Sequence, residues 1–408
     1  MRFIHTSDWH LGRTLHGADL AEHQALFLDW LLEAAVGVGA DAVVVAGDVY
    51  DRAVPSLDAV RLLDSALAGF ARAGIQVVAI SGNHDSAVRL GFGSGLSERA
   101  GIHLRTSVPD LARPVLIPDS GGDVAIYGIP YLLPDAVMDE LGAQRSHESV
   151  LSAAMSRVLA DAAKRGVSRT VVAAHAFVAG GQACESERDL RVGGIGDVGA
   201  GVFTGAGYAA LGHLHGAQRL AETIAYSGSP LAYSFSERGH TKAVTVVAMS
   251  PAGVVSAEQL PVPVPRPLRE IRGRLDELLR GGGRELDELR GAWLKVVLTD
   301  PVRPVAPMER LRDRWPHTLI LDFQPEGGIA DAEADLRRLA GITDPGEICE
   351  MFVAYTGKAP PDQAEREVLA DVVERCQHAE QLAEATALSR AGAAVPGPRS
   401  GMVPDAAA

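Results

Sequence analysis

The sequence has little of what would tie it to an oxidising compartment or to a membrane. Among 408 residues there are three cysteines, Cys184, Cys349 and Cys376. An odd number of cysteines so far apart does not form a disulfide framework. No apolar run is long enough to cross a bilayer, and the chain begins with a strand-like segment rather than an apolar leader. We therefore expect a cytoplasmic protein that does not associate with membranes.

Two further shortages narrow the possible functions. The sequence has no Gly-x-x-x-x-Gly-Lys-Ser/Thr phosphate loop, so an ATP-controlled reaction would need its ATPase on a separate chain. Positive charge is also scarce, because 52 acidic residues against 38 Lys and Arg give a formal net charge of −14. That balance argues against a general nucleic-acid binder. Basic residues outnumber acidic ones between Arg266 and Trp315, however, and acidic residues prevail from Pro325 onward. If DNA is bound, the basic segment and a partner must contribute.

The clearest positive signal is the stretch Asp41–Asp51. Its apolar, β-branched run, Val43 to Val45, predicts a strand buried on both faces of a sheet. Gly47 allows a tight exit, and Asp48 follows at the carboxyl end, where α/β sheets place their ligands. An isolated Gly-Asp usually only ends a strand, but other predicted strands end in similar residues. We interpret Asp48 as a carboxylate that bridges two metal ions, one oxygen to each.

Polar side chains also follow four other predicted strands. Asp8 and His10 come after the strand Arg2–Ser7, and residues two apart on an extended chain point the same way and can chelate one ion. The strand Ile75–Ile80 ends in Gly82-Asn83-His84-Asp85, for which a helix cap is the alternative interpretation. The remaining candidates are His175, which ends the strand Thr170–His175, and His213 and His215, whose strand spacing would turn both rings to one site.

These side chains form a mixed set of oxygen and imidazole ligands: Asp8, His10, Asp48, Asn83, His175, His213 and His215. Without a thiolate, the set suits manganese, iron or zinc rather than magnesium alone. Two ions that share Asp48 would lie about 3.5–4 Å apart and could clamp a phosphate in line with an activated water. His84 is not needed for coordination, so we expect it to be the catalytic residue that protonates the leaving oxygen or stabilises transition-state charge, oriented by Asp51 or Asp85.

The order Asp-x-His, Gly-Asp-x-x-Asp, Gly-Asn-His-Asp, His and Gly-His-x-His resembles the calcineurin-like metallophosphoesterase superfamily. Within it, the chain is similar to the SbcD family of bacterial nuclease subunits through the segments Asp8–Gly12, Asp48–Arg52, Gly82–Ser86 and Tyr226–Pro230. The resemblance implies an α/β fold, a four-layer sandwich of two mixed sheets flanked by helices, with a small α+β cap domain and C-terminal helices. It assigns Asp8, His10, Asp48 and His215 to one ion, and Asp48, Asn83, His175 and His213 to the other.

The resemblance also implies a reaction and partners. The family uses manganese and cuts DNA, as a 3′–5′ exonuclease on duplex ends and an endonuclease on single strands and hairpins, in DNA recombination, replication and repair. The implied assembly, at the nucleoid, is a heterotetramer in which a homodimer of this chain pairs with an SbcC-like coiled-coil ATPase. The helix after Pro55 and the segment Arg89–Leu96 are the expected dimer contacts. A small-molecule phosphodiesterase of the same superfamily and a catalytically inactive DNA-end scaffold are the alternatives, and the intact ligand set weakens the second.

Composition predicts five parts of the chain. We expect a nuclease domain in residues 1–260, a stiff Pro-rich linker in 261–267 and an α+β cap that helps to bind DNA in 268–344. Residues 345–384 are expected to form partner-binding helices, because residues 361–382 carry apolar side chains at helical spacing and little chain remains to cover them. Residues 385–408 are rich in Ala, Gly, Pro and Ser, which predicts a disordered tail.

Overall fold

The computed structural model describes residues 1–187, 198–326, 344–357 and 360–376, so the predicted disordered tail lies outside the described residues. The chain divides into two units, Met1–Phe323 and Gln324–Ala408. The metal ligands predicted from the sequence all belong to the first unit, which contains two large sheets and one small sheet.

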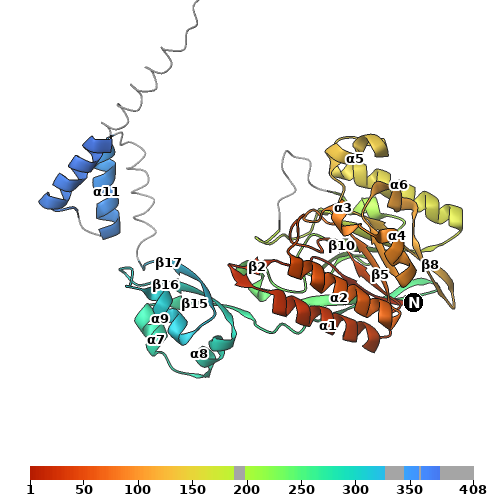
Figure 1. Cartoon of the computed structure of the whole chain (residues 1–408), viewed down its shortest axis with the longest axis horizontal. Helices are drawn as coiled ribbons and strands as arrows, with labels where there is room; N and C mark the ends of the chain where they lie inside the picture. The colour runs from red at the N-terminus through yellow and green to blue at the C-terminus, as the bar shows by residue number, and fades with distance from the viewer. Residues whose placement is uncertain (188–197, 327–343, 358–359, 377–408) are drawn as a thin grey trace, which may run out of the picture. The chain divides into compact units, whose positions relative to one another are not determined.

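Two six-stranded mixed sheets form the frame of the first unit (Figure 1). In the first sheet, four strands run parallel, β1 (Arg2–Thr6), β4 (Ala42–Val45), β5 (Gln76–Ile80) and β6 (Ile102–Arg105), and β13 (Ala243–Ser250) and β14 (Gly253–Pro261) add an antiparallel hairpin beside β1. In the second sheet, the parallel strands are β8 (Gly122–Ile129), β9 (Arg169–His175), β10 (Tyr208–Gly212) and β12 (Ile224–Tyr226), flanked by antiparallel β7 (Val115–Asp119) and β11 (Gln218–Ala221).

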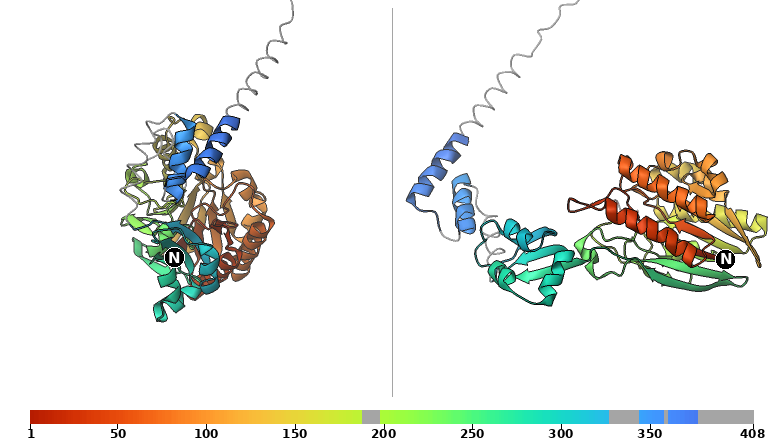
Figure 2. Two further views of the ribbon diagram at one scale, coloured as in Figure 1. Left: turned by 90° about the vertical axis from the view of Figure 1, so that its left-hand side faces the viewer. Right: turned by 60° about the horizontal axis from the view of Figure 1, so that its bottom comes forward.

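The alternation of side chains along the strands builds the layers. In β4, Val44 points into the core between the two sheets, whereas Val43 and Val45 point to the helices on the outer face of the first sheet. Those helices are α1 (Ala21–Gly37) and α2 (Leu57–Ala73), which lie side by side over that face (Figure 2). The Ser56 hydroxyl caps the start of α2 by accepting a hydrogen bond from Ala59 N. Because both faces of β4 are covered, its apolar run needs no polar alternation.

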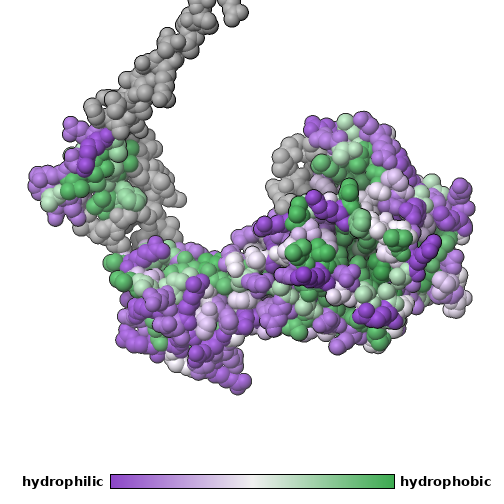
Figure 3. Space-filling model, viewed as in Figure 1, coloured by the Kyte–Doolittle hydropathy of each residue, from purple (hydrophilic) through white to green (hydrophobic). Residues whose placement is uncertain are grey.

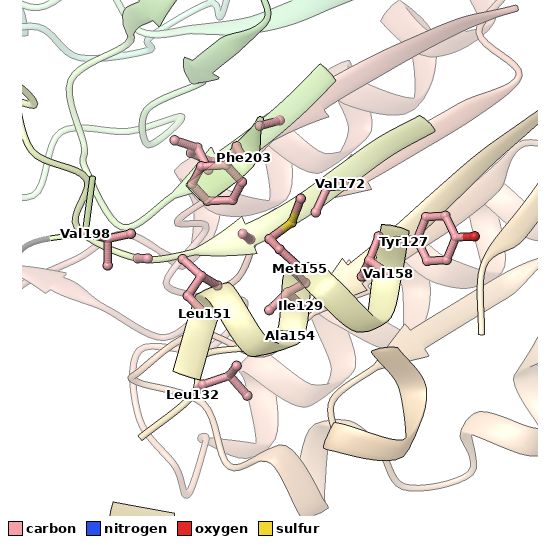
Figure 4. Close-up of a cluster of buried hydrophobic side chains, with 14 of the residues drawn as sticks. Tyr127, Ile129, Leu132, Leu151, Ala154, Met155, Val158, Val172, Val198 and Phe203 are labelled. Atoms are coloured by element: carbon pink, nitrogen blue, oxygen red, sulfur yellow. The ribbon is translucent and has the colours of Figure 1, made fainter. Parts of the chain in front are cut away.

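The second sheet is covered in the same way by α5 (Pro134–Leu141) and α6 (His147–Arg165). Leu151, Met155 and Val158 of α6 pack on Tyr127 and on other side chains of β8 and β9 (Figure 4). The order of layers is therefore helices, sheet, sheet, helices. This arrangement confirms the predicted four-layer α/β sandwich.

A three-stranded parallel sheet forms a separate small core within the first unit. Its strands are β15 (Leu268–Gly273), β16 (Trp293–Leu298) and β17 (Thr318–Phe323), and its helices are α7 (Leu275–Arg280), α8 (Arg284–Glu288) and α9 (Pro307–Arg314). Leu294, Val296, Leu311 and Trp315 fill the space between sheet and helices. These strands and helices have the α+β character predicted for the cap.

Shorter elements complete the described chain. They are β2 (Thr14–Leu15), β3 (Ala18–Asp19), α3 (Ala87–Leu90), α4 (Ser94–Ser97) and 3₁₀ turns at Glu98–Ala100, Val108–Ala112, Ala200–Phe203, Phe235–Gly239 and Leu289–Gly291. In the second unit, α11 (Pro345–Gly357) and residues 363–376 are helical. No helix among the described residues combines the length and the apolar character that spanning a membrane requires.

Candidate metal centre

The carboxyl ends of β1, β4, β5, β9 and β10 bring the predicted ligands together. One ligand atom each from Asp8, His10 and His215 lie within 4.8 Å of one another, and the same holds for the trio of Asp8, Asp48 and His175. A third trio joins His10 and Asp48 to His84. Asp8, His10 and Asp48 each belong to two of the trios, so the trios form one continuous cluster, as a site for two adjacent ions requires.

Asn83 links the last ligand candidates to this cluster. Its Oδ1 lies 2.9 Å from His175 Nε2 and 3.2 Å from His213 Nδ1. The structure therefore brings all seven predicted ligands and His84 into one buried site. Which of them would hold which ion stays a prediction.

The backbone conformation that produces this arrangement differs from the one predicted. Asp8 and His10 were expected on an extended chain, but β1 ends at Thr6 and their φ angles are 53° and 44°. His213 and His215 were expected within a strand, but β10 ends at Gly212 and His213 has a φ of 106°. Side chains therefore converge through left-handed turns just beyond the strands, a strained conformation typical of functional sites.

Two glycines allow the strand ends to approach so closely. A Cβ on Gly82 would overlap the carboxylate of Asp48, and a Cβ on Gly47 would overlap the His175 ring. Gly47 also has a φ of 91°, which favours glycine. Substituting either residue would push apart the groups that form the centre.

The electrostatics of the cluster fit a cation. Burial, followed by the neighbouring Asp48 carboxylate, raises the pKa of Asp8 well above its usual range. Burial lowers the pKa of His175 and of His215 to about 4, so both rings are neutral at pH 7 and can offer lone pairs. His10 Nε2 and His215 Nε2 lie only 3.1 Å apart. Buried carboxylates and neutral imidazoles this close are stabilised by shared divalent ions, and the donor set fits them.

A layer of hydrogen bonds behind the ligands fixes which nitrogen each imidazole presents. His175 Nδ1 lies 2.9 Å from the carbonyl oxygen of Ala46, an acceptor only, so Nδ1 carries the proton and Nε2 faces the centre. His215 Nδ1 contacts Ser186 Oγ at 2.8 Å, and Ser186 in turn donates to Glu237 Oε1 at 2.6 Å. Such partners orient metal ligands and raise their basicity.

Glu237 is the centre of a buried ion pair in this layer. Its carboxylate binds the ammonium of Lys242, which also donates to the His215 carbonyl at 3.1 Å and to Ser229 Oγ at 2.9 Å. Burial opposes ionisation of Glu237, but the neighbouring His215 ring and the charge of Lys242 outweigh it and lower its pKa. The pair therefore clamps His215 at its ring and at its backbone.

None of these outer residues was predicted from the sequence. Ser186, Glu237 and Lys242 stand in no recognisable metal motif, and they reach His215 from segments far from it in sequence. The one available signal was the pair of charged residues, Glu237 and Lys242, that follows the mainly apolar segment Leu231–Phe235.

His84 is oriented by Asp51, one of the two residues considered. Its Nδ1 lies 2.8 Å from the Asp51 carbonyl oxygen, so Nε2 faces Asp48 Oδ2 at 4.0 Å. The other candidate, Asp85, instead accepts hydrogen bonds from the backbone N–H groups of Gly82, Val49 and Tyr50, at 2.8–3.0 Å. Asp85 thus ties the loop after β5 to the loop after β4.

Comparison with known proteins agrees with this geometry. Residues 1–215 match the family model of the calcineurin-like phosphoesterases, and the chain belongs to that family. Residues 264–356 match a second model, SbcD_C, described as the type 5 capsule protein repressor C-terminal domain. The chain is thus a metal-dependent phosphoesterase with an SbcD-type C-terminal region.

Three solved structures illustrate the similarity of the chain to other proteins. TT1561 of Thermus thermophilus is 12% identical over 64% of this chain and 99% of its own, with a TM-score of 0.39. The calcineurin-like phosphoesterase YfkN from Bacillus subtilis is 11% identical over 65% of this chain and 90% of its own, with a TM-score of 0.35. The Thermus thermophilus sulfate thiohydrolase SoxB is 11% identical over 64% of this chain and 56% of its own, with a TM-score of 0.33.

Proposed function

We propose that this chain is the manganese-dependent nuclease subunit of an SbcC–SbcD-type complex and hydrolyses DNA phosphodiester bonds as an exonuclease and endonuclease. The observation that carries the proposal is the SbcD_C match over residues 264–356 beside a buried centre in which the predicted Asp, Asn and His side chains lie together. A phosphoesterase for small molecules would have no need of that C-terminal region.

The residues of the centre have three different roles. Two divalent ions held by Asp8, Asp48 and the surrounding ligands would neutralise phosphate charge and supply a nucleophilic water. His84 keeps its Nδ1 proton on the Asp51 carbonyl, which leaves Nε2 to face the centre. Nε2 is the atom that would donate a proton to the leaving oxygen. The Ser186–Glu237–Lys242 layer keeps His215 in the tautomer that offers Nε2.

An exposed apolar surface supports the proposed homodimer. Val54, Leu57, Val88, Phe92 and Leu96 are each at least 67% exposed, and they lie before and within α2, α3 and α4. Figure 3 shows apolar residues gathered over this part of the domain. Leu57, Phe92 and Leu96 belong to the segments predicted to make the dimer contact, and Val54 and Val88 adjoin those segments. Large apolar side chains exposed together are typical of an interaction site.

The test compares substrates with and without metal. With manganese, the purified chain should cleave a DNA hairpin and, more slowly, bis(p-nitrophenyl) phosphate, and chelation should stop both reactions. Asp48→Ala should abolish cleavage and lower the bound metal, because Asp48 is common to two of the ligand trios. Asp58→Ala, which removes a carboxylate that is 77% exposed, is the matched control. Cleavage of the small diester without any cleavage of DNA would refute the nuclease assignment.

A further inference from the structure

A cavity of about 140 Å³ opens between the small sheet and the nuclease domain, outside the metal centre. Its walls come from the start of α1, the segment that leads to Lys242, and the stretch Val264–Arg269 with Trp293 of β16. The volume is close to the roughly 150 Å³ that holds one benzene ring. The cavity can thus enclose a single small group, but not the whole of a larger ligand.

The charge of the lining is unlike that of the protein as a whole. Arg238, Arg266, Arg269 and Lys242 line the cavity with one acid, Glu237. Lys242 neutralises Glu237 in their buried ion pair, so that carboxylate does not cancel the arginines. Among the described residues, none of the three arginines forms an ion pair, and each donates a hydrogen bond only to a backbone carbonyl. Three guanidinium groups without a carboxylate partner at one cavity, in a chain of net charge −14, favour the binding of an anion there.

The arginines are held in ways that leave donors available. Arg266 Nη1 donates to the Gly291 carbonyl at 3.0 Å, and its guanidinium lies over the Trp293 ring at 4.9 Å. That stacking fixes the plane of the Arg266 guanidinium and covers one face of the Trp293 ring. Arg238 and Arg269 are exposed and can turn toward a ligand. His23 and His240 complete the polar lining; burial lowers both of their pKa values, so they serve as neutral donors or acceptors.

We propose that this cavity binds a phosphate group, held by Arg238, Arg266 and Arg269. A guanidinium matches two oxygens of a phosphate at once, and a phosphate is small enough for the space. The proposal rests on the proposed function, because a nuclease meets phosphate groups both in the DNA chain and in the nucleoside monophosphates that it releases. The cavity borders the Glu237–Lys242 pair, so the bound group would lie beside the layer that holds His215.

Binding can be measured by calorimetry on the full chain in chelator, which keeps phosphate from binding at the metal centre. Inorganic phosphate and thymidine 5′-monophosphate should bind, and thymidine should not. The double variant Arg238→Gln, Arg269→Gln should weaken phosphate binding at least tenfold. The matched control is Arg280→Gln, Arg284→Gln. It removes two charged side chains, in α7 and α8, that are 79% and 92% exposed.

A short oligothymidylate without terminal phosphates distinguishes phosphates of the DNA chain from those of the released nucleotides. If it binds with arginine dependence, the site takes chain phosphates; if only the monophosphate does, the site takes the released product. Absence of binding by every phosphate probe at about 10 mM, or equal binding by both double variants, would overturn the proposal. Cleavage of bis(p-nitrophenyl) phosphate is read separately. If phosphate binding depends on the arginines but the chain does not cleave the diester, the proposed function is refuted and the phosphate site is still supported.

Discussion

At the scale of single residues, two hydrogen bonds fix the orientation of His84 at the centre. Its backbone N donates to Asp48 Oδ1 at 2.9 Å, and its Nδ1 lies 2.8 Å from the Asp51 carbonyl oxygen. His84→Gln should keep the bound metal but lower kcat by about 10²–10⁴-fold, the usual effect of removing a general acid. Metal content and manganese-dependent cleavage are measured together. His103→Gln, toward the amino end of the same sheet, is the control. Loss of metal with activity would make His84 a ligand.

Glu237 acts on the centre through His215 and not through the reaction itself. Glu237→Gln removes the charge that binds Lys242 and weakens the acceptor for Ser186, so His215 loses its fixed orientation. We expect manganese affinity to fall about 10–100-fold, as is usual when a partner behind a metal ligand is removed. Calorimetric titration with manganese measures this affinity, and Glu258→Gln, which changes an exposed side chain, is the control. Unchanged affinity would limit Glu237 to a structural role.

At the scale of elements, the strands were predictable and the turns beyond them were not. Val43 to Val45 and Val77 to Ile80 are apolar because both faces of the sheet are covered, and this pattern located Asp48 and Asn83 at strand ends. The left-handed turns at Asp8, His10 and His213 leave no pattern in the sequence, since they depend on contacts such as the 3.1 Å hydrogen bond from His213 N to Asp8. The outer residues around His215 were missed for the same reason.

His5 of β1 is a buried polar link between the two sheets. Its Nδ1 lies 3.2 Å from Tyr208 Oη and its Nε2 3.1 Å from the Leu211 carbonyl oxygen, both on β10. Burial lowers the pKa of His5 to about 4, although the hydrogen bond with Leu211 opposes this. The native ring is therefore neutral at pH values where the unfolded ring, with its ordinary pKa near 6.5, already binds a proton.

The pH dependence follows from that difference. Stability from His5 is fully present above about pH 6.5 and is lost as the pH falls toward about 4, at up to roughly 1.4 kcal/mol per pH unit. In metal-free wild-type protein, the free energy of unfolding should fall with pH over this range, because unfolding takes up one proton at His5. His5→Gln should lack that contribution to the slope. Urea unfolding at several pH values measures it. Equal slopes in both proteins would contradict the assignment.

The apolar surface on α2, α3 and α4 should control self-association. Phe92 is 88% exposed, and Phe92→Glu would place a charge in the proposed dimer contact. We expect a dimer at micromolar concentration to become a monomer, with cleavage of bis(p-nitrophenyl) phosphate retained. Val305→Glu, which alters a side chain that is 86% exposed on the small domain, should leave the dimer intact. Light scattering distinguishes the two, and a monomeric wild-type chain would remove the basis for the dimer.

At the scale of the whole molecule, the second unit offers apolar side chains that its described part does not cover. Phe352 of α11 is 66% exposed, and Val368 and Val372, one turn apart in the helix of residues 363–376, are 63% and 44% exposed. An apolar stripe on a helix pair of this kind fits a helical groove or coiled coil. We infer that the SbcC-like ATPase covers it.

Deleting the residues after Thr356 should separate catalysis from assembly. The metal ligands belong to Met1–Phe323, a unit distinct from Gln324–Ala408, so metal content and single-strand cleavage should persist. Binding to the ATPase subunit and any stimulation by ATP should disappear, because Val368, Val372 and the rest of their helix are lost. The pair Val368→Asp, Val372→Asp should act like the deletion, since two buried charges would oppose docking, whereas Glu367→Gln should not. Co-purification of the truncated chain with the ATPase at full stoichiometry would show that the partner binds elsewhere.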